Sequence, residues 1–153
     1  MSALTPRGRV LIVDDQIEIR EGMQLLLEFE GMDVITHDSM ITLPFILRDA
    51  APEVILLDLS MGALSGQSFF ALDRTRLLRN ADAAVLLFSA RPSRELAALA
   101  EELGADGFVA KSLDSMEIVA RVRASIDQQR ALRAERTRED SNAINRAASS
   151  SAR

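Results

Sequence analysis

Two kinds of hydrophobic pattern alternate along the chain. One is a short run of consecutive apolar residues, many of them β-branched, which is typical of a strand buried on both faces of a parallel sheet. The other is a longer segment whose apolar residues recur every three or four positions, which indicates an amphipathic helix. The short runs predict five strands, at 10–13, 33–36, 54–57, 84–88 and 107–110.

A helical segment follows each of these strands. The segments lie at about 18–30, 40–50, 66–80, 92–104 and 114–126. Alternation of strand and helix predicts an α/β fold, in which a parallel sheet is covered by helices on both faces. For five strands the common order is 2-1-3-4-5, the flavodoxin-like, doubly wound arrangement.

Helix boundaries are marked by residues with known end preferences. Asp114 is placed to cap the last helix, and Gly104 to end the helix before it. Pro44 is compatible with the helix at 40–50 only in its first turn, with Ser39 or Thr42 as the N-cap. These signals fix where the predicted helices begin and end.

Composition limits the class of protein. Apolar residues make up 48% of the 153 residues but aromatic residues only 4%, so aliphatic side chains and alanine must fill the core. There is no cysteine, which excludes disulfides, thiolate metal sites and a thiol nucleophile. Residues 1–9 contain no hydrophobic segment of a signal peptide, and no apolar run has the ~20 residues of a membrane span. We therefore expect a soluble, cytoplasmic protein without membrane contact.

The net charge of −5 is divided unevenly along the chain. Residues 1–123 carry 12 basic and 19 acidic side chains, or −7, whereas residues 124–153 carry 6 and 4, or +2. Nucleic-acid binding depends on clustered positive charge. We therefore expect no direct contact with nucleic acid.

Polar side chains follow four of the predicted strands. Asp14 and Asp15 follow the first strand, Asp58 the third, Ser89 the fourth and Lys111 the fifth. In the 2-1-3-4-5 order these strands are neighbours, so all five side chains meet at one edge of the sheet. Three carboxylates together require neutralisation, and Mg²⁺ prefers carboxylate ligands. Carboxylate, Mg²⁺, ammonium and hydroxyl are the groups that phosphoryl transfer onto an aspartate requires.

Simpler interpretations of these residues remain. Asp58 could be a paired structural carboxylate rather than a reacting group, and Asp14 and Asp15 could be the acidic start of a helix. Lys111 could be an ordinary surface residue. However, Lys111 is the only lysine beside 17 arginines, and it ends a predicted buried strand. A compact ammonium at that position favours the site over the simpler alternatives.

The chain resembles the receiver domain of two-component response regulators over roughly residues 8–128. The resemblance rests on four motifs at predicted strand ends. They are Val13-Asp14-Asp15, Leu57-Asp58, Phe88-Ser89-Ala90 and the segment Gly104-Ala105-Asp106-Gly107-Phe108-Val109-Ala110-Lys111.

The resemblance implies a role for each residue. Asp58 would be the phosphoacceptor. Asp15 would bind Mg²⁺ directly, Asp14 mainly through water, and the main-chain carbonyl of Ser60 would be a further ligand. Lys111 would pair with Asp58 and then with its phosphate.

Two further residues would transmit the change. Ser89 would close onto the phosphoryl oxygens, and Phe108 would rotate inward in response. This rotation would alter the face formed by the fourth helix, the fifth strand and the fifth helix, which the new dianion would bias between two packings. Phe108 could equally be a plain core aromatic, and Ser89 an ordinary hydroxyl at a strand end.

Several positions depart from the family pattern. Ser112 replaces the proline that usually follows the lysine, so we expect a trans bond with a shifted loop or a strained cis bond. Gly62-Ala63 replaces Pro-Gly after the central strand. Ser60 and Arg91 occupy positions that tune the phosphate's lifetime in the family, and our hypothesis is that Arg91 shields the acyl phosphate. His37, the only histidine, is expected away from the site, as a structural or surface residue.

The predicted domain organisation is a receiver domain at 1–128 followed by a charged helical extension and tail at 129–153. Residues 128–140 favour a solvated helix, a long coiled coil is not expected, and 147–151 are expected to be disordered. The chain is interpreted as a stand-alone, chemotaxis-regulator-like receiver or a fragment of a longer regulator.

The resemblance implies a signalling switch rather than an enzyme. Its only catalysis would be its own Mg²⁺-dependent phosphorylation and dephosphorylation. A histidine kinase or histidine phosphotransfer protein would supply the phosphoryl group, a downstream protein would receive the signal, and a phosphorylation-dependent homodimer could form. The alternatives are a pseudo-receiver acting as a constitutive adaptor, and an aspartyl phosphatase. A phosphatase would need a second carboxylate where Ser60 stands and a cap domain.

Overall fold

The computed structural model describes residues 7–61 and 82–152. Its strands are β1 Arg9–Val13, β2 Asp33–His37, β3 Val54–Asp58, β4 Ala84–Ser89 and β5 Gly107–Ala110. Its helices are α1 Ile17–Phe29, α2 Leu43–Ala50, α5 Ser93–Leu103 and α6 Ser115–Ser151. The helix predicted at about 66–80 and the turn at Gly62-Ala63 lie outside the described residues.

The five strands form one sheet in the order β2-β1-β3-β4-β5, and every neighbouring pair is parallel. This confirms the predicted flavodoxin-like fold. The prediction succeeded because buried parallel strands leave continuous apolar runs in the sequence.

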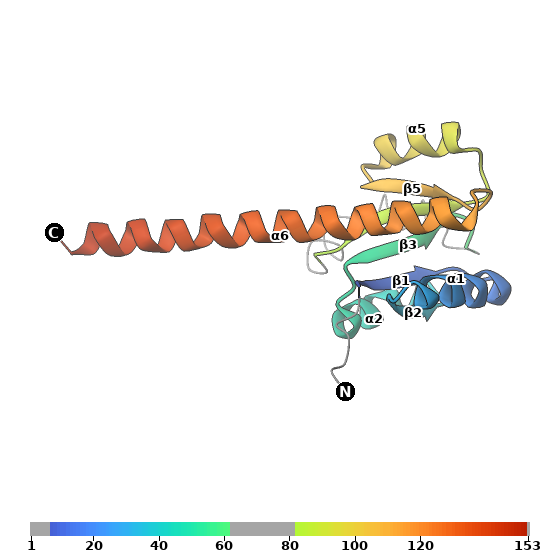
Figure 1. Cartoon of the computed structure of the whole chain (residues 1–153), viewed down its shortest axis with the longest axis horizontal. Helices are drawn as coiled ribbons and strands as arrows, with labels where there is room; N and C mark the ends of the chain where they lie inside the picture. Colours follow the sequence, from blue (N-terminus) through green and yellow to red (C-terminus); the bar gives the residue numbers. More distant parts are fainter. Residues whose placement is uncertain (1–6, 62–81, 153) are drawn as a thin grey trace.

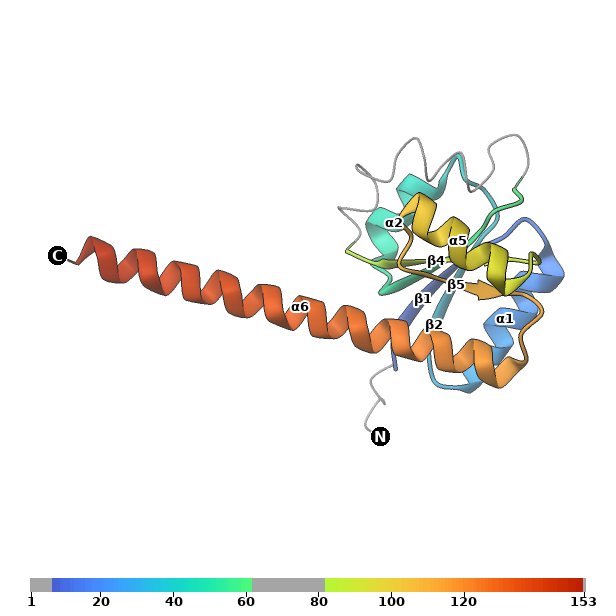
Figure 2. The ribbon, with the colours of Figure 1, turned by 90° about the horizontal axis from the view of Figure 1, so that it is seen from above.

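The described helices cover both faces of the sheet. Helices α1 and α6 pack on one face, and α2 and α5 on the other (Figure 1, Figure 2). Side chains of each strand alternate between the two faces, so Leu56 and Phe88 join the core under α1 and α6, whereas Leu57 and Leu87 join the core under α2 and α5. The sheet therefore separates two cores.

Most of the predicted helix ends are confirmed. The Asp114 carboxylate accepts hydrogen bonds from two backbone N–H groups at the start of α6, and Gly104 ends α5 in the left-handed conformation. Pro44 lies in the first turn of α2. Thr42 occupies the N-cap of α2, but its side chain makes no cap hydrogen bond, and its Oγ1 lies 2.8 Å from Nε2 of His37.

The prediction that residues 147–151 are disordered is wrong. Helix α6 continues to Ser151, 37 residues in all, and its second half projects beyond the sheet (Figure 1). The packed first half supplies the nucleus, so extending the helix through alanine and arginine costs little. The hydroxyls of Ser149 and Ser151 also bond to carbonyls four residues earlier in the helix. Within the described residues, no helix is both long enough and apolar enough to span a bilayer.

Helix α6 is attached to the sheet edge where β3 and β4 begin. Arg130 makes two hydrogen bonds to Glu53, at 2.6 and 2.9 Å, and Arg133 pairs with Asp82 at 2.9 Å. Arg136 also pairs with Asp82, at 2.5 Å. We call these contacts of Arg130, Arg133 and Arg136 the amino-edge clamp. Because of the clamp, the segment at 128–140 is not only a solvated helix.

Candidate functional site

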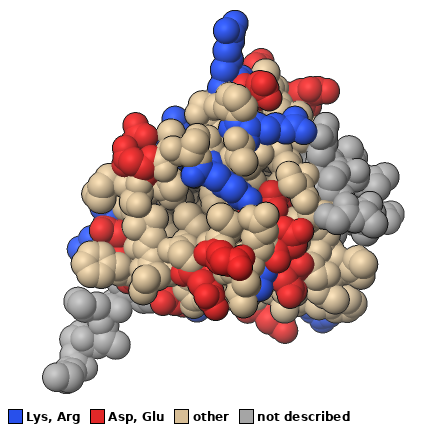
Figure 3. All heavy atoms as spheres, turned by 90° about the vertical axis from the view of Figure 1, so that its right-hand side faces the viewer, with Lys and Arg blue, Asp and Glu red and all other residues tan. Residues whose placement is uncertain are grey.

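The five polar side chains predicted to share one sheet edge do lie there. Asp58 and Ser89 are the last residues of β3 and β4, while Asp14 and Lys111 directly follow β1 and β5. Asp15 extends the first of these strand ends. Figure 3 faces this edge and shows acidic side chains gathered there, with a few basic ones among them. The parallel order of the strands is what brings these side chains together.

Asp14 is fully buried, and both of its carboxylate oxygens and its main-chain carbonyl have partners. Its Oδ1 accepts a hydrogen bond from the backbone N–H of Gln16 at 2.9 Å, and its Oδ2 lies 2.6 Å from Nζ of Lys111. Its main-chain carbonyl accepts a hydrogen bond from Arg20 of α1 at 2.8 Å. The turn from β1 into α1 is therefore fixed by the same residue that supplies a carboxylate to the site.

Asp58 is only 2% exposed. Its Oδ1 accepts a hydrogen bond from the backbone N–H of Ser60 at 3.1 Å and lies 3.5 Å from Nζ of Lys111. Burial raises the pKa of Asp58 above its ordinary value, and the charges of Asp14 and Asp15 act in the same direction. The Lys111 ammonium and the Ser60 N–H oppose that rise.

The site has an excess of negative charge. One carboxylate oxygen from each of Asp14, Asp15 and Asp58 lies within 4.8 Å of the other two, and Asp15 is exposed to solvent. The single ammonium of Lys111 offsets only one of these three charges. Clustered oxygen ligands with one open side fit a hard divalent cation such as Mg²⁺. The residues present therefore suit a Mg²⁺ site.

Lys111 reaches across the edge of the sheet. It follows β5, yet its Nζ lies beside carboxylates of β3 and of the β1 end. On the way it passes over β4, where the ring centroid of Phe88 lies 4.9 Å from Nζ. The ammonium is closer to Asp14 than to Asp58, although the resemblance implied Asp58 as its partner.

The other residues of the predicted site make fewer contacts. Ser89 is 2% exposed, and its Oγ accepts a hydrogen bond from the backbone N–H of Arg91 at 3.2 Å. The side chains of Ser60 and Arg91 are exposed. Both residues thus border the site.

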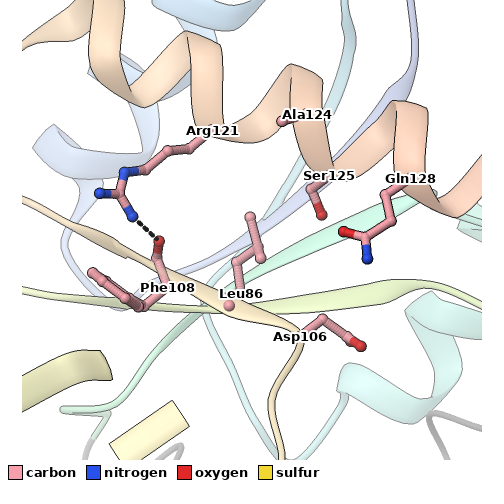
Figure 4. A pocket seen from close by; sticks show the side chains of 8 residues that line it. Leu86, Asp106, Phe108, Arg121, Ala124, Ser125 and Gln128 are labelled. Atoms are coloured by element: carbon pink, nitrogen blue, oxygen red, sulfur yellow. Dashed lines mark hydrogen bonds between the residues drawn. The ribbon is translucent and has the colours of Figure 1, made fainter. Parts of the chain in front are cut away.

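Phe108 lies in β5, the outermost strand on one side of the sheet, and is partly buried. The guanidinium of Arg121, from α6, lies 4.8 Å from its ring centroid and donates a hydrogen bond to its main-chain carbonyl at 3.3 Å. Beside this pair, a groove of about 210 Å³ runs between β5 and α6, with Ser125 and Gln128 on its α6 side (Figure 4). The Arg121 guanidinium thus contacts both the ring and the main chain of Phe108, on the face that is expected to carry the signal.

His37 and Ser112 adjoin residues of the site. His37 was expected away from this edge, but it is the last residue of β2 and its carbonyl accepts a hydrogen bond from the N–H of Asp14 at 3.1 Å. The Nε2 atom of its imidazole contacts Thr42 and not the carboxylates, which agrees with the expected structural role. The Lys111–Ser112 bond is trans.

Three residues at or near the site were not singled out from the sequence. Arg20 lies six residues after Asp14, and this spacing does not predict a contact when a turn lies between the two residues. Phe88 pairs in register with Asp58, and the alternation of the strands could have identified it. Arg121 was one of many arginines, and only its contact with Phe108 distinguishes it.

Comparisons with known proteins agree with this geometry. The family model of the response regulator receiver domain matches residues 10–123. The chain is 32% identical over 133 residues to the alkaline phosphatase synthesis transcriptional regulatory protein SphR of Synechococcus elongatus, covering 80% of this chain and 50% of SphR. It is 30% identical over 123 residues to the DNA-binding response regulator MtrA of Mycobacterium bovis, covering 80% and 52%. The chain spans about half the length of the curated relatives it matches.

Solved structures share the fold. A CheY-like response regulator receiver domain protein of Methanospirillum hungatei superposes with a TM-score of 0.69 at 21% identity, covering 81% of this chain and 97% of that one. Full-length FixJ of B. japonicum gives a TM-score of 0.71 at 22% identity, covering 89% and 66%.

Proposed function

This chain belongs to the response regulator receiver domain family of two-component systems, and from that premise we propose that it is a phosphorylation-dependent switch with Asp58 as phosphoacceptor. The observation that carries this proposal is the buried carboxylate of Asp58, 3.5 Å from the only lysine of the chain, within a cluster of three acids. A structural ion pair would need one carboxylate for this lysine, and the cluster has three.

The proposed reaction transfers one phosphoryl group. An oxygen of Asp58 forms a bond to phosphorus while the bond to the donor, a histidine nitrogen or the acetate oxygen of acetyl phosphate, breaks and the donor keeps the electron pair. Lys111 offsets charge on the phosphoryl oxygens, and the Ser89 hydroxyl donates a hydrogen bond to one of them.

Magnesium completes the proposed site. When bound, Mg²⁺ offsets negative charge on the carboxylates and on the incoming phosphoryl oxygens. Asp15, Asp58 and the main-chain carbonyl of Ser60 would hold it directly, and Asp14 would hold it through water. Support for the three carboxylates comes from their grouping, since one oxygen of each lies within 4.8 Å of the other two.

The proposed partners act at two surfaces. A histidine kinase or phosphotransfer protein donates the phosphoryl group at the edge where the strands end. A downstream protein, or a second copy of the chain on phosphorylation, contacts the face of α5, β5 and α6 that includes Phe108. We also propose that the protein is cytoplasmic and that this segment does not itself bind nucleic acid, although relatives such as MtrA are DNA-binding regulators.

The test is incubation with magnesium and acetyl phosphate followed by intact-mass measurement. We expect the parent chain to gain the mass of one phosphoryl group and Asp58→Asn to gain none. Asp127→Asn, which removes an exposed carboxylate on α6, is the matched control and should behave as the parent. No mass gain in the parent would instead support the pseudo-receiver, and turnover of an added phosphoester would support an aspartyl phosphatase, although the receiver family is not a family of catalytic enzymes.

We further propose that Arg91 and Ser60 tune the phosphate's lifetime, because both flank the site on its exposed side. Arg91→Ala should speed loss of the phosphoryl group by exposing the acyl phosphate to water. The measurement is the half-life of the phosphorylated mass after removal of acetyl phosphate. An unchanged half-life would rule out shielding by Arg91.

A further inference from the structure

We propose that Phe88 is a positioning residue for phosphorylation of Asp58, because its ring holds the ammonium of Lys111 over the acidic cluster. The inference rests on the proposed function of Asp58 and Lys111. Phe88 is 1% exposed and lies immediately before Ser89 in β4.

The topology makes the lysine cross this ring. Lys111 starts at the end of β5, and its carboxylate partners lie at the ends of β3 and β1. Strand β4 lies between them, and neighbouring strands are about 4.8 Å apart. The lysine side chain must therefore span β4 before it reaches either carboxylate.

Register and alternation place an aromatic ring at that crossing. Phe88 pairs with Asp58 across the β3–β4 ladder and with Val109 across the β4–β5 ladder. Paired residues of parallel strands point to the same face of the sheet. The side chain of Phe88 thus lies on the face where Asp58 projects, between the base of the lysine and its partners.

The contact has the geometry of a cation–π interaction. The Nζ atom lies 4.9 Å from the ring centroid, inside the ~6 Å limit for such contacts. The carboxylates of Asp14 and Asp58 attract the ammonium from one side. The negative face of the Phe88 ring attracts it from another. An aliphatic residue would fill the core here, but it would not attract the cation.

The chain offers an unusually clean probe, since Lys111 is its only lysine. Protein grown with ¹³Cε-labelled lysine gives one lysine resonance without further assignment. Protons near the face of an aromatic ring are shifted upfield, so the parent should show an upfield-shifted Lys111 resonance that moves toward the free-lysine position in Phe88→Leu. This measurement needs no phosphodonor.

A second experiment measures phosphorylation after Phe88 alone is replaced with phenylalanine that carries one, two or three ring fluorines. The fluorines weaken the negative charge on the ring face and change the ring volume very little. We expect the rate of phosphorylation by acetyl phosphate to fall stepwise, to about three- to tenfold below the parent for the trifluoro ring, with an unchanged melting temperature. The same replacement at Phe29, exposed on α1, is the control and should leave the rate unchanged. If Phe88→Leu does not fold, the fluorinated series still tests the proposal.

Two outcomes would overturn the inference. One is a lysine resonance that is the same in the parent and in Phe88→Leu. The other is a phosphorylation rate that does not depend on fluorination. Failure of the proposed function is distinguishable, because the parent itself would then gain no phosphoryl mass.

Discussion

At the scale of single residues, the site is a buried arrangement of charges in which one cation serves two carboxylates. Lys111 lies 2.6 Å from Asp14 and 3.5 Å from Asp58, so Asp14 is the better-neutralised acid of the two. The less well paired carboxylate is the proposed nucleophile. Burial of the incompletely neutralised Asp58 carboxylate lowers the stability of the fold, as the raised pKa of this group indicates.

The pKa of Asp58 leads to a stability prediction. Because burial raises this pKa in the folded state, the folded chain holds the proton more tightly than the unfolded chain, and stability falls as pH rises from the ordinary pKa through the raised one. Without magnesium at neutral pH, Asp58→Asn should therefore raise the free energy of unfolding by about 1 kcal/mol.

Urea denaturation at several pH values tests this prediction. The gain should shrink at acid pH, where Asp58 of the parent is protonated, and magnesium should stabilise the parent more than the variant. Asp127→Asn is again the control. An Asp58→Asn variant that is less stable than the parent at neutral pH would contradict the prediction. It would indicate that the attraction between Lys111 and Asp58 outweighs the cost of burying the Asp58 carboxylate.

At the scale of elements, α6 is the unusual part of the fold. Its first half packs on the sheet, and the amino-edge clamp then holds its middle through Glu53 and Asp82. Hydrogen bonding by Arg130 lowers the pKa of Glu53. This contact therefore stabilises the fold above the ordinary pKa of glutamate and is lost as pH falls through the lowered one.

Two truncations test the clamp and the proposed boundary between 1–128 and 129–153. A chain ending at 140 should melt as the parent does, because residues 141–152 are exposed throughout. A chain ending at 128 lacks Arg130, Arg133 and Arg136, and its free energy of unfolding should fall by about 1–2 kcal/mol. Thermal and urea denaturation report both values, and equal stabilities for the two truncations would show that the clamp adds nothing.

At the scale of the whole molecule, charge is separated from the apolar cores. The sheet divides two aliphatic cores, and the acidic groups gather at the edge where its strands end. The clamp uses three of the basic residues of 124–153 in ion pairs with the body. The other three arginines of that segment are outnumbered by its four acidic residues, so no net positive charge remains there.

The charge distribution predicts that this chain alone does not bind duplex DNA. Fluorescence anisotropy with a labelled duplex at about 50 mM salt, where electrostatic binding is strongest, should show no saturable change. The double variant Glu53→Gln/Asp82→Asn, which frees the clamp arginines, is an informative comparison. Tight, salt-dependent binding by the parent would contradict the prediction and would place nucleic acid among the direct partners.

The sequence alone was enough for the five strands and their order, for the four helices that the described residues contain apart from the full length of α6, and for the gathering of five polar side chains at one edge. Apolar runs identify buried strands, and the parallel order puts their ends together whatever the side chains do. Asp14, Asp15, Asp58, Ser89 and Lys111 could all be placed by this rule.

Only the tertiary structure decided which of these groups contact one another. The preference of Lys111 for Asp14, its passage over Phe88, the hold of Arg121 on Phe108 and the partners of the α6 arginines each join residues distant in sequence. Such contacts depend on the rotamers of long side chains and on the course of a helix over the sheet. Local sequence patterns carry no information about either, because they record burial and periodicity and not the positions of neighbours in space.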